Sequence, residues 1–199
     1  MAFKAANQML EPDPRYADLV VVEAGGVRRL TMDDHHAAIA AIVLMGEAPQ
    51  EVRDAFDRAR NVLLYAWFDY DLLVTAESQA FGAFELALKR RLNGNGAGKG
   101  GALFKLISEA REQGVLPAPT TSAVGRIDPI EALRHMRNEL AHGTTDVHSP
   151  AMALDVAGAC EGDRPRLSET RSGAVIGSIS LEVYARCLTL GGAKAAARS

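Results

Sequence analysis

The feature that most constrains the fold is a helical pattern of apolar residues that runs from Gln50 to Leu92. Apolar side chains recur there at the spacing of one helix face, in two successive stripes. The first stripe comprises Val52, Phe56, Ala59, Val62 and Leu63, and the second comprises Leu73, Ala76, Ala80, Phe84, Ala87 and Leu88. The aromatic stretch 65–70 lies between them and either breaks the helix or lies within one unbroken helix. Such a segment predicts a mainly α fold, in which helices pack against helices.

Shorter elements flank this segment on both sides. Residues 19–23 and 27–31 are rich in β-branched side chains around a Gly25-Gly26 turn, which predicts a β-hairpin. Thr31 and Asp34 have capping-box spacing and predict a helix that continues to about Met45. Three more helices are expected, over 102–113, from Asp128-Pro129 to His142, and over 150–160. Alternation over 179–185 favours a C-terminal strand that pairs with the hairpin.

The composition is that of one folded domain with appendages. The chain has 199 residues, of which 48% are hydrophobic and 24% charged, and this excludes disorder and fibrous classes. We therefore expect a helical domain over 33–161, an N-terminal extension over 1–32 that holds the hairpin, and a C-terminal extension over 162–199. A net charge of −3 argues against a globally basic surface, so any nucleic-acid contact must come from a local patch.

The expected location is cytoplasmic. The two cysteines, Cys160 and Cys187, are too few to staple a secreted chain and do not have zinc-like spacing. The longest apolar run, 37–45, is less than half of the roughly 20 residues that cross a bilayer. We expect no membrane partner, no metal and no cofactor.

The helix that starts at Asp128 carries the most informative residues. On a helical wheel Arg137 falls within its apolar arc, and Glu77 falls within the second stripe of the long segment. A guanidinium at a core-facing position needs a partner, so we predict an ion pair in which Glu77 orients Arg137. The alternative is that both side chains lie at the edges of their faces and extend to solvent.

Polar residues on the same helix suit phosphate chemistry. His142 stands at the predicted C-terminus before Gly143, where the helix dipole favours a protonated imidazole. Asn138 lies one turn earlier on the same face and can orient the ring or a bound phosphate. Arg134 and His135 lie on the polar arc of the helix. His148 is close enough to His142 in the sequence to line the same cleft as His142. If Arg137 forms a buried ion pair with Glu77, Arg134 and His135 would be the residues that bind phosphate.

Arg137-Asn138-Glu139-Leu140-Ala141-His142 resembles the RxxxxH signature of the HEPN superfamily, the higher eukaryotes and prokaryotes nucleotide-binding proteins. The polar residue that often follows the arginine is Asn138 here. The order of helices before the motif also resembles stand-alone bacterial members, and the similarity covers about residues 50–161.

The resemblance implies a helical bundle that forms a homodimer with two RxxxxH motifs in one cleft. It implies a metal-independent endoribonuclease. A toxin, a defence or a housekeeping role would each fit such an enzyme, with or without an antitoxin-like protein partner. The RNA 2′-hydroxyl would attack the adjacent phosphate, leaving a 2′,3′-cyclic phosphate. His142 would act as general base or acid, Arg137 would stabilise charge on phosphorus, and Asn138 would position the phosphate, while the partner's histidine supplies the second proton-transfer group. Arg134, His135 and His148 would contact substrate. Some HEPN members are instead non-catalytic modules that bind nucleotides or proteins.

Other patterns receive a structural interpretation. The glycine-rich segment 93–101 lacks the spacing of a phosphate-binding loop and predicts a connector. We expect solvated polarity for 33–36, because consecutive histidines on a helix diverge by about 100° and do not share a metal easily. Aromatic residues in 65–70 are expected to pack rather than to stack on bases. Lys89-Arg90-Arg91 complements a helix C-terminus, with a phosphate-binding surface as the alternative.

Overall fold

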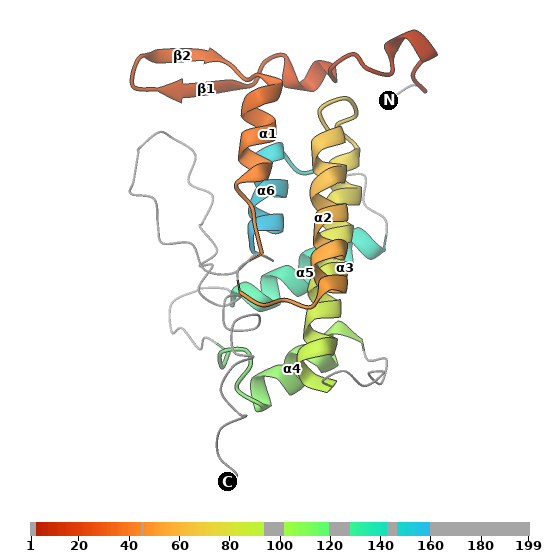
Figure 1. Cartoon of the computed structure of the whole chain (residues 1–199), viewed down its shortest axis with the longest axis vertical. Coiled ribbons are helices and arrows are strands. Elements are labelled where there is room, and N and C mark those ends of the chain that lie inside the picture. The colour runs from red at the N-terminus through yellow and green to blue at the C-terminus, as the bar shows by residue number, and fades with distance from the viewer. Residues whose placement is uncertain (1–2, 45, 94–101, 120–127, 143–146, 160–199) are drawn as a thin grey trace.

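The computed structural model describes residues 3–44, 46–93, 102–119, 128–142 and 147–159 (Figure 1). The chain is mainly α with a small β appendage, as predicted. Two short 3-10 helices, Ala6–Gln8 and Pro14–Tyr16, precede the regular elements. The remaining elements, in chain order, are β1 (Val20–Glu23), β2 (Gly26–Arg29), α1 (Met32–Ala40), α2 (Gln50–Tyr65), α3 (Leu72–Asn93), α4 (Leu103–Glu112), α5 (Pro129–Ala141) and α6 (Pro150–Ala159). The expected C-terminal strand and most of the glycine-rich connector lie outside the described residues.

Helix α3 is the centre of the fold and packs against α2, α4, α5 and α6 (Figure 1). The two predicted apolar stripes supply its core contacts. Phe56 and Leu63 of α2 and Leu73 and Leu88 of α3 are each at most 1% exposed. Each aliphatic or aromatic side chain that is fully buried contributes roughly 1.5–3 kcal/mol. The α2–α3 interface, which is the most extensive contact between two helices here, therefore stabilises the bundle most.

The long helical segment is broken, which settles the alternative that the sequence left open. Helix α2 ends at Tyr65, and α3 begins at Leu72 after a turn. Within the turn Trp67 is 7% exposed, and its ring lies 4.8 Å from that of Tyr16, centroid to centroid. The packing role predicted for the aromatic stretch is confirmed for Trp67, whereas Tyr65 is exposed.

Helix α1 starts as predicted but ends early. Thr31 and Asp34 form the capping box, with the Thr31 hydroxyl accepting from the Asp34 N–H. The helix ends at Ala40 and not near Met45, so the predicted end was wrong. Arg60 of α2 donates to the carbonyl oxygens of Ile39 and Ala40 and so satisfies the last turn from another helix.

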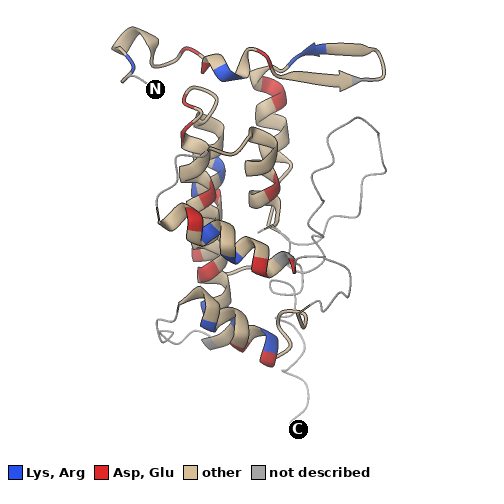
Figure 2. Ribbon diagram, turned by 180° about the vertical axis from the view of Figure 1, so that it is seen from behind, with Lys and Arg blue, Asp and Glu red and all other residues tan. Residues whose placement is uncertain are grey.

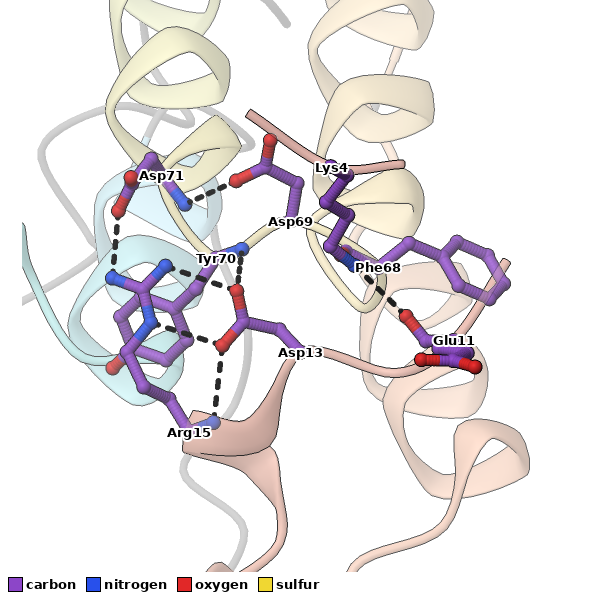
Figure 3. Close-up of polar contacts among 8 residues, drawn as sticks. All are labelled: Lys4, Glu11, Asp13, Arg15, Phe68, Asp69, Tyr70 and Asp71. Atoms are coloured by element: carbon purple, nitrogen blue, oxygen red, sulfur yellow. Dashed lines mark hydrogen bonds and ion pairs between the residues drawn. The ribbon is translucent and has the colours of Figure 1, made fainter. Parts of the chain in front are cut away.

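The N-terminal extension is bound to the α2–α3 turn through Asp13 (Figure 3). Its carboxylate accepts from Arg15 Nε and Nη2 and from the Tyr70 N–H, each at 3.0 Å. Arg15 also pairs with Asp71 at 2.6 Å, and Lys4 donates to the Phe68 carbonyl. The β1–β2 hairpin extends from this end of the molecule, with α4 at the opposite end (Figure 1).

The hairpin is antiparallel, as predicted. Val20 pairs with Arg29 and Val22 with Val27, so these four residues share one face. The turn needs a positive backbone φ at Gly26, which is 133°. Among the described residues no helix is long and apolar enough to cross a membrane.

Candidate functional site

Helix α5 is held at its start by a cluster of charges. The Asp128 carboxylate caps the helix by accepting from the backbone N–H groups of Ile130 and Glu131, and Pro129 occupies the first turn, as predicted. Arg111 of α4 pairs with Asp128 at 2.9 Å and with Glu131 at 3.0 Å. This network fixes α5 against α4 and thereby positions the motif that follows.

Arg137 is the least constrained arginine of the motif helix. Among the described residues its guanidinium has two polar contacts, each at 3.5 Å, one from Nη2 to Glu85 Oε2 of α3 and one from Nη1 to Asn138 Oδ1. Both exceed the usual hydrogen-bond length, and the side chain is 37% exposed. Arg134, by contrast, is held by Glu131 at 2.7 Å. Arg137 therefore keeps donor capacity for an anion.

The predicted pair between Glu77 and Arg137 is wrong. Glu77 is 1% exposed, as a core position requires, but its Oε2 contacts His148 Nδ1 at 2.8 Å. Arg137 contacts Glu85 instead. Eight residues separate the two glutamates, which places them about 12 Å apart along the axis of α3. The helical wheel correctly placed Glu77 on the core side of its helix. It contained no information on the position along the α3 axis at which Arg137 approaches.

Glu77 is an incompletely satisfied buried acid. Its Oε1 has no hydrogen-bond partner among the described residues. Burial raises the pKa of this carboxyl, and the His148 ring acts in the opposite direction. His148 thus lies against α3 at the start of α6, and its ring is committed on one side to Glu77.

His142 ends the motif helix, as predicted. It is the C-cap of α5, and its backbone N–H donates to the Asn138 carbonyl at 3.0 Å. The residue is exposed, and within the described parts of the chain its ring makes no hydrogen bond or ion pair. Gly143, expected to end the helix, lies outside the described residues. The imidazole at this end is therefore accessible to a ligand.

The structure brings the other predicted ligand residues together only in part. Arg134 Nη2 lies 3.3 Å from His135 Nε2 on the polar side of α5. Arg137 contacts Asn138, but His148 makes its polar contact with Glu77 and not with residues of α5. The predicted set therefore divides between α5 and the α3–α6 contact.

One contact at this site escaped prediction. Lys89 Nζ lies 2.8 Å from Glu85 Oε1, so Glu85 is placed between Lys89 and Arg137. The four-residue spacing of Glu85 and Lys89 on a helix is a sequence pattern that predicts an ion pair. No sequence pattern predicts that Arg137 also contacts Glu85. Figure 2 shows acidic and basic residues intermixed along the helices, in keeping with a composition that argues against a globally basic surface.

The acidic and histidine-rich start of α1 places one of its histidines in the core. His35 is 3% exposed, and its Nε2 donates to the Leu63 carbonyl at 2.8 Å. Solvation was predicted for this residue, and that prediction was wrong, because α1 turns it towards Tyr16 and Trp67. Burial lowers the pKa of this imidazole. Across the described ranges no three His, Cys, Asp or Glu side chains gather as metal ligands would.

A surface hollow of about 310 Å³ lies between α1 and α2. It is lined in part by His36, Asp57 and Arg60. Arg60 is already engaged by Asp57 at 2.8 Å and by the end of α1. The hollow therefore offers fewer unoccupied donors than the end of α5.

The chain was compared with family models, curated proteins and solved structures, and none of them matches it.

Proposed function

We propose that this chain is a HEPN-type, metal-independent endoribonuclease that acts through Arg137, Asn138 and His142. The observation that carries the proposal is the exposure of the Arg137 and His142 side chains and the weakness of the polar contacts that Arg137 makes. The Arg137 guanidinium is 37% exposed, its polar contacts with the part of the chain that the structure describes are 3.5 Å long, and five residues later an exposed imidazole ends the same helix. The RxxxxH resemblance assigns chemistry to this arrangement.

The reaction uses a nucleophile that RNA itself supplies. A base removes the proton of the ribose 2′-hydroxyl, and the oxygen attacks the adjacent phosphorus. The bond from phosphorus to the 5′-oxygen breaks, and an acid protonates the leaving oxygen. The products are a 2′,3′-cyclic phosphate and a 5′-hydroxyl, and DNA is resistant because it lacks the nucleophile.

The side chains divide the work as follows. Arg137 stabilises the negative charge that develops on the phosphate oxygens, since a guanidinium donates several N–H groups to an oxyanion. Asn138, beside Arg137, positions the phosphate. His142 transfers one proton, and in a homodimer the same histidine of the second copy transfers the other.

The second candidate is a non-catalytic module that binds a nucleotide or a protein such as an antitoxin. The specific observation in its favour is the contact between Arg137 and Glu85, since an arginine that is paired with a carboxylate has less donor capacity for the transition state of catalysis. The two candidates differ in whether the motif histidine is needed for turnover or for binding alone.

The test is cleavage of a mixed-sequence RNA in EDTA by the wild type, by His142→Ala and by His36→Ala. His36 is an exposed histidine on α1 and provides a matched control. We expect cyclic-phosphate products from the wild type and the control, and a fall in rate of about 10²-fold or more in His142→Ala. Circular dichroism spectra should be the same for all three proteins.

Cleavage that His142→Ala retains in full would contradict the proposed role of His142. Absence of cleavage by the wild type, together with binding of RNA or a nucleotide that depends on Arg137, would favour the non-catalytic module.

A further inference from the structure

We infer that Lys89, Glu85 and Arg137 form a binding site for one phosphate of a nucleic-acid strand, in which Glu85 occupies the anion position until the phosphate displaces it. The inference rests on the proposed function, because it assigns the ligand of Arg137. It adds two residues of α3 that the motif does not contain.

The geometry is that of two cations bridged by one anion. Lys89 Nζ contacts Glu85 Oε1 at 2.8 Å, and Arg137 Nη2 approaches Glu85 Oε2 at 3.5 Å. Lys89 comes from α3 and Arg137 from α5, so the two charges converge across a helix–helix contact. A phosphodiester also presents two equivalent oxygens with one shared negative charge, and it can bridge the same two cations.

The unequal distances indicate which contact is weak. The contact with Lys89 has ordinary ion-pair length, whereas the contact with Arg137 is longer than a good hydrogen bond. All three side chains are partly exposed, at 20% for Glu85, 32% for Lys89 and 37% for Arg137. A ligand therefore reaches the cluster from solvent, and Glu85 can rotate away without leaving a buried charge.

The net charge of the cluster favours binding of a phosphate. The three side chains carry a net charge of +1, and one bound phosphodiester neutralises it. Glu85 lowers the affinity for that phosphate through like-charge repulsion while it orients Arg137 in the free protein. Glu85 therefore positions Arg137 in the free protein and limits the affinity of the site for phosphate.

The test measures binding in a background that does not cleave. A fluorescently labelled single-stranded RNA of mixed sequence is titrated with the His142→Ala protein, and anisotropy is recorded at several salt concentrations. Glu85→Gln and Lys89→Gln are each combined with His142→Ala. Glu51→Gln provides the matched control, because Glu51 is an exposed acid paired with another α3 cation, Arg90.

We expect Glu85→Gln to raise the affinity by roughly threefold to tenfold, and Glu51→Gln to change it by less than about twofold. Lys89→Gln should weaken binding and reduce the slope of log K against log salt by about 0.7, the value for one phosphate of a single strand. Binding of single-stranded DNA of the same sequence should change in the same way in these variants, since RNA and DNA both carry the phosphate. Thermal unfolding checks that each variant is folded.

Equal effects of Glu85→Gln and Glu51→Gln would overturn the inference, as would weaker binding by Glu85→Gln or no binding by any of the proteins. An unchanged salt slope in Lys89→Gln would also overturn it. These outcomes are separate from the cleavage test. Binding that responds as expected in a protein that never cleaves RNA would refute only the ribonuclease, whereas cleavage by the wild type with no response to Glu85→Gln would refute only the phosphate site.

Discussion

Replacing Asp13 with asparagine should detach the N-terminal extension from the α2–α3 turn and lower the stability of the whole chain. Burial raises the pKa of the Asp13 carboxyl, but hydrogen bonds from the Arg15 side chain and from the backbone N–H groups of Tyr70 and Arg15 outweigh it, and the pKa falls from 3.8 to about 2. The carboxylate is therefore more stable as an anion in the folded chain than in the unfolded chain.

The size of the effect follows from this difference. One pKa unit corresponds to about 1.4 kcal/mol, so the ionised carboxylate contributes roughly 2 kcal/mol near neutral pH. Asparagine also leaves an amide NH₂ facing donors, and the total cost should be about 2–4 kcal/mol. Asp71→Asn is the control, because Asp71 contacts the same Arg15 but is 48% exposed, and its loss should cost less than about 1 kcal/mol.

The pH dependence gives an independent check. Because the folded pKa is lowered, the stabilisation is present above pH 3.8 and is lost as the pH falls towards 2. The difference between wild type and Asp13→Asn in free energy of unfolding should shrink by about 1 kcal/mol from about pH 5.5 to about pH 3. Urea unfolding followed by circular dichroism measures it. A difference that is independent of pH, or no larger than that of Asp71→Asn, would refute the reasoning.

Two further predictions concern the helices. Leu88→Ala removes a side chain of α3 that is 0% exposed and should cost about 2–5 kcal/mol in urea unfolding, whereas Phe104→Ala, at a position 59% exposed, should change stability by less than about 0.5 kcal/mol. Similar losses for both would mean that α3 is not the core of the fold. Thr31→Ala removes the α1 cap and should cost about 1 kcal/mol, with Thr75→Ala on the exposed side of α3 as the control that lacks a cap. A stability loss no larger than in the control would show that the capping box contributes nothing.

The order of the α-helices was readable from the sequence, because their formation depends on neighbouring residues. The apolar stripes of α2 and α3 repeat at the helical period, and their members are buried except for the partly buried Val62. The start of α5 at Asp128-Pro129 and the capping box of α1 are likewise local interactions between a side chain and backbone groups two or three residues away.

The candidate site was readable only in part. The position of His142 at the end of α5 followed from the local pattern, but the environment of Arg137 did not. The N-terminal extension shows the same limit, since Asp13 finds the Tyr70 N–H 57 residues away. Asp13 caps the short helix that begins at Pro14, and this local pattern indicates a turn but does not name the surface that receives it.

The sequence by itself determined the order of the α-helices and the buried sides of α2 and α3. Only the tertiary structure decided that Arg137 contacts Glu85, that Glu77 contacts His148, and that Arg60 completes the end of α1. The reason is geometric. Helical periodicity fixes the direction of a side chain around its own axis, whereas the axial level at which two helices touch depends on how their whole surfaces pack, and that level determines which charges meet.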